Sequence, residues 1–492
     1  MVLAASSPPH VDNYEMQSTV SSSSLLRGPS DDDFFEGNDD AVHAKEHRSL
    51  MLRLGASFFL FGLINNVLYV IILSAALDLV PPSTPKGIIA FCNIAPALAA
   101  KVGWPYILKG RIRYAKRLMG CCVLSAFGML VVAFFDSLFM RLLGIGIASF
   151  SSGLGELSFL QLSTTYAPPS VAGHSVGYFA SGTGAAGLVG AFLWWEVRGL
   201  GVRVGVGLSS VMPFIIPLTY YALLPRPPAF LASSAAYEDR PSATAANMPY
   251  TPLATAEDDM VGEEEGSSPS GPKYNVSLSP SDKWRLVRPL LVRYMLPLFC
   301  VYLFEYTINQ GIAPTLLYPV PSQEDHAFLS KIIHSVRDYY PLWQLVYQTT
   351  VFLSRSSISI GIPPIPARLL PLPAILQAGI LLVLAVESAV GLFPADADEA
   401  WSIAAVFLLI SLEGICGGSA YVNVFYRINQ DPPSPHTVHD IERTRQEREF
   451  KIGSVGFADS SGILFAAVLA VPMEVALCRQ QVSRGKFLCK GL

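Results

Sequence analysis

The sequence predicts an all-α, polytopic membrane protein with about eleven transmembrane helices, and two observations support that prediction. Only 15% of the 492 residues are charged, whereas a soluble domain has about 25%. The charges are also unevenly placed, because long apolar stretches alternate with charged loops. Eleven of these stretches reach the ~20 residues that a helix needs to cross a bilayer. Membrane lipid is therefore the expected surrounding. No nucleic-acid motif is present, so no nucleic acid is expected as a partner.

The first six apolar stretches make the predicted first bundle, residues 51–224. They lie near residues 54–77, 87–106, 117–135, 140–163, 172–195 and 204–224. Residues 1–50 are polar and rich in serine, so we expect a disordered, cytoplasmic N-terminal segment. This segment lacks the features of a cleaved signal peptide, and we expect the first apolar stretch itself to target the chain to the membrane.

A polar segment, residues 225–283, separates the two halves of the chain. It is rich in Pro, Ser and Ala and carries an acidic run at 257–265, which predicts a disordered cytoplasmic linker. Five further apolar stretches make the predicted second bundle, residues 284–476, and residues 477–492 form a basic tail. The five lie near residues 290–314, 341–361, 369–392, 400–424 and 453–476. This layout is typical of a two-lobed transporter.

The distribution of Lys and Arg predicts the orientation in the membrane. Three basic loops fall on the same side as the N-terminus, at 109–117, 283–288 and 443–451, so that side should be cytoplasmic. The tail does not fit this count. Eleven spans place it on the opposite side, yet its four basic residues favour the cytoplasm, so its side stays open.

The seven cysteines show no spacing that predicts a metal site or a disulfide. Most lie inside apolar stretches, and we expect them to pack there as small hydrophobic residues with free thiols. Cys489 stands where a prenylated cysteine would, but Lys490 and Gly491 are not aliphatic. Whether it is lipidated stays open.

Seven charged residues lie within or at the edge of the predicted spans. They are Lys101, Glu156, Glu305, Arg355, Glu387, Glu413 and Asp459. A carboxylate at mid-membrane costs roughly 2.5–3.5 kcal/mol on insertion scales, so Glu305 should face a partner helix or a watery path. Asn309 lies one helical turn further on and shares that face. Glu387 lies near a helix end, where we expect solvent.

Two interpretations of these charges stay open. In the first, Lys101 and Arg355 pair with two of the acids and hold the bundles together. In the second, the remaining acids bind protons or a cationic group, because burial disfavours the ionised form of a carboxyl group.

Corresponding stretches of the two halves carry unusual residues at similar places. The pairs are 64–66 with 308–310, Lys101 with Arg355, 153–156 with 413–418, and 181–184 with 459–462. Such an echo is expected of two parallel bundles related by an axis along the membrane normal. The sequence therefore predicts a major-facilitator-like two-bundle fold with a substrate site between the bundles.

The glycines of 182–187 match the G-x-G-x-x-G pattern of dinucleotide-binding proteins. That function needs a preceding strand and a βαβ unit, and here the glycines lie inside an apolar stretch instead. Close helix packing through small residues explains the pattern better.

Several segments, taken together, carry a resemblance to a known family. They are Glu305–Gly311, Ser354–Ser357, Ser152–Leu157, Ser181–Gly187, Glu413–Gly418, Tyr421–Asn423 and Asp459–Gly462. In these segments the chain resembles battenin, the lysosomal membrane protein of Batten disease, and its fungal vacuolar members. The resemblance runs from about Leu50 to Val475. The divergent ends and long linker are more similar to a fungal member.

This resemblance implies a vacuolar or lysosomal membrane, with Golgi and endosome membranes as further locations. It implies a role in vacuolar pH homeostasis and in the transport of basic amino acids such as arginine. Animal members are linked to the export of glycerophosphodiesters, and the fold is similar to the major-facilitator type.

We therefore expect a vacuolar transporter whose partners are lipid, a small-molecule substrate and protons. The alternative is a non-transporting scaffold that regulates the vacuolar proton pump or trafficking proteins. An enzyme is not expected, because no nucleophile with a base is recognisable, and neither a cofactor nor a metal is expected. The candidate substrate- and proton-binding residues are Lys101, Glu156, Glu305, Asn309, Gln310, Arg355, Glu413, Asn423 and Asp459.

Overall fold

The structure is a computed structural model of the chain. It describes residues 31–74, 86–107, 112–197, 200–230, 278–321, 329–393, 399–432 and 441–491, and within them it contains helices but no strand. The chain divides into two units, residues 1–48 and 49–492. Apart from the beginning of α1, the description below concerns the second unit.

The helices of the first bundle lie close to the predicted spans. They are α1 (Asp31–Ser74), α3 (Lys86–Ile107), α4 (Tyr114–Phe134), α5 (Leu138–Ser163), α6 (Pro169–Val197) and α7 (Val202–Ser209). The sixth predicted span is broken. After α7 it continues as a 3₁₀ turn, Met212–Phe214, the short α8, Ile215–Leu218, and a π-helical turn, Thr219–Leu223. Pro213 and Pro217 interrupt it, because proline has no amide hydrogen to donate.

The second bundle begins at α10 (Pro280–Leu290), where Ser279 caps the helix by accepting a 3.1 Å hydrogen bond from the amide of Asp282. The other helices of this bundle are α11 (Leu296–Thr307), α12 (Tyr339–Arg355), α13 (Leu372–Val390), α14 (Glu399–Gln430) and α15 (Ile441–Ser483). A π-helical turn, η6 (Ile308–Ile312), directly follows α11.

Two of the predicted segment boundaries differ from the positions at which helices begin. α1 begins at Asp31, inside the segment 1–50 for which the sequence predicts disorder, and residues 1–30 lie outside the described part. α10 begins at Pro280, inside the expected linker 225–283, of which residues 231–277 are outside the described part. Capping and the amphipathic pattern of α10 extend the second bundle toward the linker.

Within the described residues, nine helices are long and apolar enough to cross a membrane. The predicted second and eighth spans, α3 and α12, are not among them. Both carry polar residues that line an internal cavity, Asn93 and Lys101 on α3 and Gln348 and Arg355 on α12. α12 is also short, since 17 residues rise about 26 Å along a helix axis.

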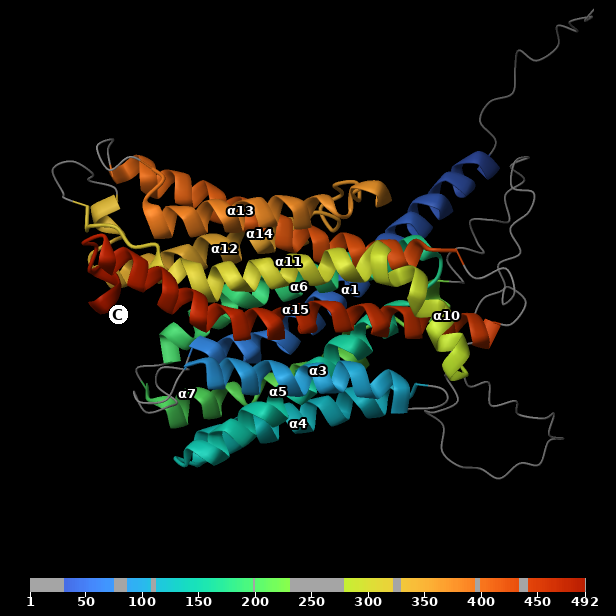
Figure 1. The fold of residues 1–492 in the computed structure, drawn as a ribbon. Coiled ribbons are helices and arrows are strands. Elements are labelled where there is room, and N and C mark those ends of the chain that lie inside the picture. The colour runs from blue at the N-terminus through green and yellow to red at the C-terminus, as the bar shows by residue number, and fades with distance from the viewer. Residues whose placement is uncertain are drawn as a thin grey trace, which may run out of the picture. The chain divides into compact units, whose positions relative to one another are not determined.

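The helices run side by side in two groups (Figure 1). In that view α11 to α14 lie above and α3, α4, α5 and α7 below, while α15 runs between them. The two groups meet along two seams. In one seam α15 packs against α3 and α5, and in the other α6 packs against α12 and α14. This is the predicted two-bundle arrangement.

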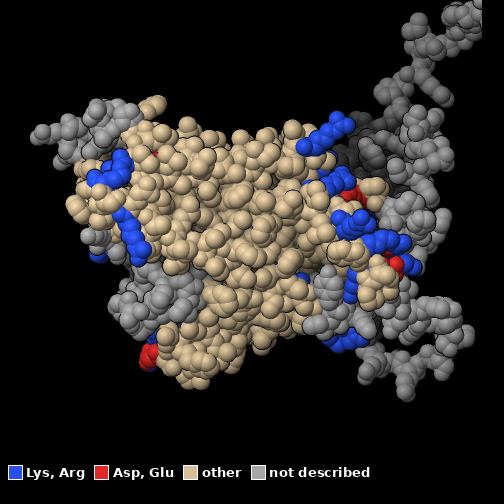
Figure 2. Space-filling view, in the orientation of Figure 1, with Lys and Arg blue, Asp and Glu red and all other residues tan. Residues whose placement is uncertain are grey.

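An uncharged belt crosses the middle of the visible face, and charged side chains gather at its two ends (Figure 2). One end carries the beginnings of α4, α10 and α15 with Arg113, Lys116, Lys283, Arg285 and Lys451. We call it the basic end. Large apolar residues such as Val292 and Phe465 are exposed in the belt, as expected for surfaces that contact lipid.

The glycines of α6 pack against neighbouring helices, as the sequence predicts. A Cβ on Gly182 would collide with the carbonyl oxygen of Phe59 on α1, and one on Gly187 with Gln348 on α12. Small residues thus let α6 approach helices of both bundles. No dinucleotide-binding geometry is formed, because the segment is helical throughout.

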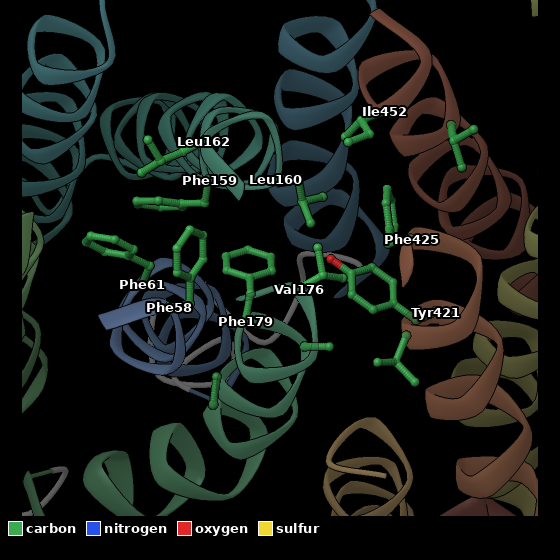
Figure 3. Close-up of a cluster of buried hydrophobic side chains, with 14 of the residues drawn as sticks. Phe58, Phe61, Phe159, Leu160, Leu162, Val176, Phe179, Tyr421, Phe425 and Ile452 are labelled. Carbon is green, nitrogen blue, oxygen red and sulfur yellow. The ribbon is translucent and has the colours of Figure 1, made fainter. Parts of the chain in front are cut away.

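The bundles are in contact near the basic end. Aromatic and aliphatic side chains of both bundles converge there, among them Phe159 and Val176 from the first and Tyr421, Phe425 and Ile452 from the second (Figure 3). Polar contacts accompany this apolar layer. They include Tyr114 donating to Glu449 Oε1 at 2.6 Å, Gln161 donating to the carbonyl oxygen of Glu449 at 3.1 Å, and Gln430 donating to the carbonyl oxygen of Pro169 at 2.8 Å.

The expectation of free thiols is wrong for two cysteines, because Cys478 and Cys489 form a disulfide. α15 ends at Ser483, and Gly485 adopts a φ of +86°, which favours glycine and reverses the chain. The reversal brings residue 489 back beside the helix. A spacing of eleven residues across an unrecognised turn gave no signal of this pairing. The other five cysteines are free.

Candidate functional site: a charged cavity between the bundles

A cavity lies between the two bundles, on the side of the apolar layer away from the basic end. Eight helices line it, α1, α3, α5 and α6 from the first bundle and α11, α12, α14 and α15 from the second. Its lining includes Lys101, Glu156, Arg355 and Asp459, which are four of the nine residues predicted from sequence.

Lys101 makes an ion-pair triad that joins the bundles. Its ammonium nitrogen lies 2.9 Å from Glu156 Oε2 on α5 and 3.2 Å from Asp459 Oδ2 on α15. The second oxygen of Glu156 accepts a 2.8 Å hydrogen bond from the hydroxyl of Tyr421 on α14. Since Lys101 and Asp459 are each only 4% exposed, mutual pairing is what makes their burial tolerable.

Arg355 behaves differently from Lys101, because it forms no ion pair with any acid of the described residues. It donates to Thr183 Oγ1 at 2.7 Å and to the hydroxyl of Tyr302 at 2.9 Å, and its guanidinium lies 4.5 Å from the ring centroid of Tyr421. Its Nε has no hydrogen-bond partner among the described residues. The first of the two open interpretations, in which both cations pair with acids, therefore holds for Lys101 but not, within the described residues, for Arg355.

Glu305, Asn309 and Glu413 form a second cluster, buried inside the second bundle. Asn309 donates to Glu413 Oε1 at 2.8 Å, and Gln344 donates to Asn309 Oδ1 at 2.9 Å. Tyr347 donates to Glu305 Oε1. The π-helical turn η6 contains Asn309, and such turns are frequent at functional sites.

Two predicted residues lie outside both clusters. Gln310 is half-buried, and it does not line the cavity. Asn423 is buried, but it accepts a 2.7 Å hydrogen bond from the amide of Ile365 and donates to the carbonyl oxygen of Ser419 at 2.8 Å. Together with Arg427, which donates to the carbonyl oxygen of Ile365 at 2.9 Å, it holds the loop after α12.

Sequence reasoning missed several residues of the cavity. Its aromatic lining is formed by Tyr69, Tyr302, Tyr306, Tyr347 and Tyr421. Tyrosines in an apolar span are unremarkable individually, and only their convergence reveals them. Asn93 was also missed. It is 2% exposed, lines the cavity, and neither its amide nitrogen nor its amide oxygen has a hydrogen-bond partner.

Glu387 differs from its expected solvated state. The residue is 4% exposed, and its carboxylate accepts hydrogen bonds from the hydroxyl of Tyr318 at 2.9 Å and from the amide of Phe393 at 2.9 Å. A Gly391 with φ of +70° ends α13 and turns the chain back over the carboxylate. The expectation failed because proximity to a helix end does not reveal what folds over it.

The cavity brings together several kinds of polar group. Among the described residues, no group of three or more His, Cys, Asp or Glu side chains is placed to hold a metal ion. The cavity offers one guanidinium without an acidic partner, an unsatisfied amide, a ring of phenols and an acid-rich triad.

The comparisons with known proteins agree with this architecture. The model of the CLN3 protein family matches residues 56–480. Protein BTN1 of Mycosarcoma maydis is 46% identical over 494 residues, covering 89% of this chain and 88% of the relative. Protein btn1 of Schizosaccharomyces pombe is 36% identical over 443 residues, covering 89% and 97%.

A solved structure also shares the fold. The proton:xylose symporter XylE, of the major facilitator superfamily, superposes with a TM-score of 0.52 at 12% sequence identity, covering 90% of this chain and 92% of XylE. The predicted major-facilitator-like fold is confirmed. The family match confirms the resemblance noted from sequence, and the chain belongs to the CLN3 protein family, that of battenin and the fungal BTN1 proteins.

Proposed function

We propose that this multi-pass membrane protein is a secondary transporter of the vacuolar or lysosomal membrane, which moves a small charged solute by alternating access. The observation that carries the proposal is the cavity between the bundles. It contains a cation, Arg355, which forms no ion pair with any acid of the described residues. A scaffold has no need of such a group, because an intramembrane charge costs several kcal/mol by order of magnitude.

The contacts near the basic end support an alternating-access cycle. Tyr114 and Gln161 of the first bundle bind Glu449 of the second there, while the cavity lies on the other side of the apolar layer. The proposed orientation places the basic end in the cytoplasm, following the positive-inside rule. The conformation is then closed toward the cytoplasm, and transport requires these contacts to break.

The substrate proposal follows from charge. Arg355 suits the single negative charge of a phosphodiester or a carboxylate, because guanidinium binds both in a planar, two-pronged geometry. The phenol ring of Tyr421 beside it and the neighbouring tyrosines suit a cationic group through their π faces. Both a glycerophosphodiester and a basic amino acid such as arginine meet the first condition, and they are the two proposed substrates.

Vacuolar pH homeostasis follows from the same proposal if the solute flux is coupled to protons, because each cycle then moves acid equivalents across the membrane. The competing function is a scaffold that regulates the vacuolar proton pump or trafficking proteins. It predicts pH effects without any solute flux by the isolated protein.

The test is reconstitution of the full chain into liposomes with an imposed pH gradient. Uptake of labelled arginine and of labelled glycerophosphocholine is followed with the wild type and with R355Q. We expect gradient-dependent uptake of one solute, and at least a tenfold loss of it in R355Q. A thermal unfolding transition shows whether the reconstituted wild-type protein is folded. If it is folded and neither solute is transported, the result contradicts transport of the proposed solutes and favours the scaffold.

A further inference from the structure

Two buried acids, Glu305 on α11 and Glu413 on α14, both accept a hydrogen bond from Asn309, Glu413 through its carboxylate and Glu305 through its backbone carbonyl. Their residues are 1% and 0% exposed. Asn309 donates to Glu413 Oε1 at 2.8 Å and to the carbonyl oxygen of Glu305 at 3.1 Å. The Glu305 carboxylate also lies against Gly417, one turn of α14 beyond Glu413. Both acids therefore share one enclosed site.

The groups that surround this pair are nearly all uncharged. They are Tyr302 and Tyr306 from α11, Gln344 and Tyr347 from α12, and Cys416 from α14. The charged group nearby is Arg355, whose guanidinium is bound to Thr183 and Tyr302. Within the described residues neither carboxylate has an ion-pair partner at 4.0 Å or less, in contrast to Glu156 and Asp459, which share Lys101.

In the part of the chain that the structure describes, each carboxyl group keeps one oxygen without a hydrogen-bond partner, Glu305 Oε2 and Glu413 Oε2. Two adjacent ionised carboxylates without a cation repel each other, and each loses its hydration at a cost of several kcal/mol by order of magnitude. A proton on one of the free oxygens lowers this cost, because it neutralises one acid and ends the repulsion between the two. The arrangement is therefore compatible with a pair that binds a proton, and costly for a fully ionised pair.

Tyr347 connects the pair to the cavity. Its side chain lines the cavity and its hydroxyl donates to Glu305 Oε1. A proton on Oε2 leaves that hydrogen bond intact, so Glu305 keeps the same contact with Tyr347 in both protonation states. A change at the cavity that moves Tyr347 would alter the stability of the ionised form of Glu305.

We infer that Glu305 and Glu413 are a proton-binding pair, separate from the solute cavity and linked to it through Tyr347. The inference rests on the proposed transport function for its role, since it names the coupling ion and its site. The proton binds to a carboxylate oxygen of the pair when the cavity faces the acidic compartment, and it leaves when the cavity opens to the other side.

The first experiment needs no substrate. Infrared spectra of the purified full-length protein in detergent are recorded across a pH series, and the carbonyl stretch of protonated carboxylic acids is followed. We expect a band that titrates in the wild type and is missing in both E305Q and E413Q. The matched control is E387Q, because Glu387 is equally buried in the same bundle but is bound to Tyr318 and to the amide of Phe393.

The outcomes of this experiment are decisive in both directions. A titrating band that is lost with both E305Q and E413Q, and kept in E387Q, supports the pair. A wild-type protein without such a band overturns the inference, and so does a band that persists in E305Q and E413Q. If one variant fails to fold, the wild-type titration and the other variant still decide.

The second experiment tests the role in transport. The accumulation ratio of the labelled solute with and without a pH gradient is measured in liposomes. We expect the ratio to fall from above one to about one in E305Q and E413Q, and Y347F to lower it by about threefold or more. An unchanged ratio in both acid variants overturns proton coupling at this site. If the wild-type protein shows no flux of either solute, the proposed transport function is contradicted. Proton binding by the pair is then still decided by the infrared experiment.

Discussion

The ammonium group of Lys101 on α3 lies 3.2 Å from the Asp459 carboxylate on α15, and this buried contact ties the first bundle to the second beside the cavity. Glu156 holds the same ammonium from the side of the first bundle at 2.9 Å. The triad carries one positive and two negative formal charges. Its strength matters for transport, because alternating access requires the two bundles to move relative to each other.

Replacing Lys101 with methionine should destabilise the protein strongly. It leaves the buried carboxylate of Asp459 and the half-buried one of Glu156 without a cation, and removing one partner of a buried pair costs about 3–5 kcal/mol. The double variant K101M/D459N should recover part of that loss, because only one acid then remains. Thermal unfolding in detergent measures both. D136N is the control, since Asp136 is exposed and its contacts with Arg141 and Arg203 are worth no more than about 1 kcal/mol. Equal losses in the two Lys101 variants would argue against the triad.

Arg355 should bind the anionic group that both proposed substrates carry. R355K keeps the charge but loses the planar group that lies over Tyr421 and reaches both Thr183 and Tyr302. We expect R355K to raise the KM for an anionic solute about tenfold, with a smaller change in the maximal rate. Uptake kinetics at several concentrations provide the measurement. An identical KM in R355K and the wild type would show that Arg355 does not contact the solute.

Gly417 should tolerate no side chain. A Cβ there would overlap the Glu305 carboxylate, so G417A should cost about 1–3 kcal/mol through displacement of a buried acid. G379A is the matched control, because a Cβ on Gly379 of α13 meets no atom within 4 Å. Alanine favours helix over glycine by about 1 kcal/mol, so G379A should be neutral or stabilising. Melting temperatures that fall equally in both variants would contradict the close contact.

The contact between Tyr114 and Glu449 should hold the basic end closed. Y114F removes a 2.6 Å hydrogen bond between the bundles and keeps the ring. We expect faster hydrogen–deuterium exchange by mass spectrometry in peptides covering residues 114–121 and 445–455. The control is Y294F, because Tyr294 donates at 3.0 Å to Asp431 within the second bundle. If exchange in these peptides is faster in Y294F but unchanged in Y114F, Tyr114 does not hold the basic end closed.

Sequence patterns predicted the membrane fold well, because every span that crosses lipid must be a long and mostly apolar helix. Length and apolarity alone place α4, α5 and α13. The cavity residues Lys101, Glu156, Arg355 and Asp459 were also predictable, since a charge in a span stands out against its neighbours.

The ion-pair and hydrogen-bond partners of these charged residues were not predictable, because they depend on which helices pack together. Lys101 takes both Glu156 and Asp459, and this leaves Arg355 to hydroxyl groups and a ring. Asn93 gave no signal, since a single asparagine in a span is common and only its unsatisfied amide inside the cavity marks it.

The disulfide between Cys478 and Cys489 gives a prediction about the tail. Of seven cysteines, five are free, so alkylation without reduction should label five thiols and alkylation after reduction seven. Intact-mass spectrometry of the denatured protein distinguishes these. Disulfides persist in oxidising compartments and are rare in the cytosol, so the bond favours a tail on the non-cytoplasmic side, as eleven spans require.

The disulfide also leaves Cys489 without a thiol for lipidation. Seven labelled thiols without reductant, or a lipid mass on the C-terminal peptide, would contradict the disulfide.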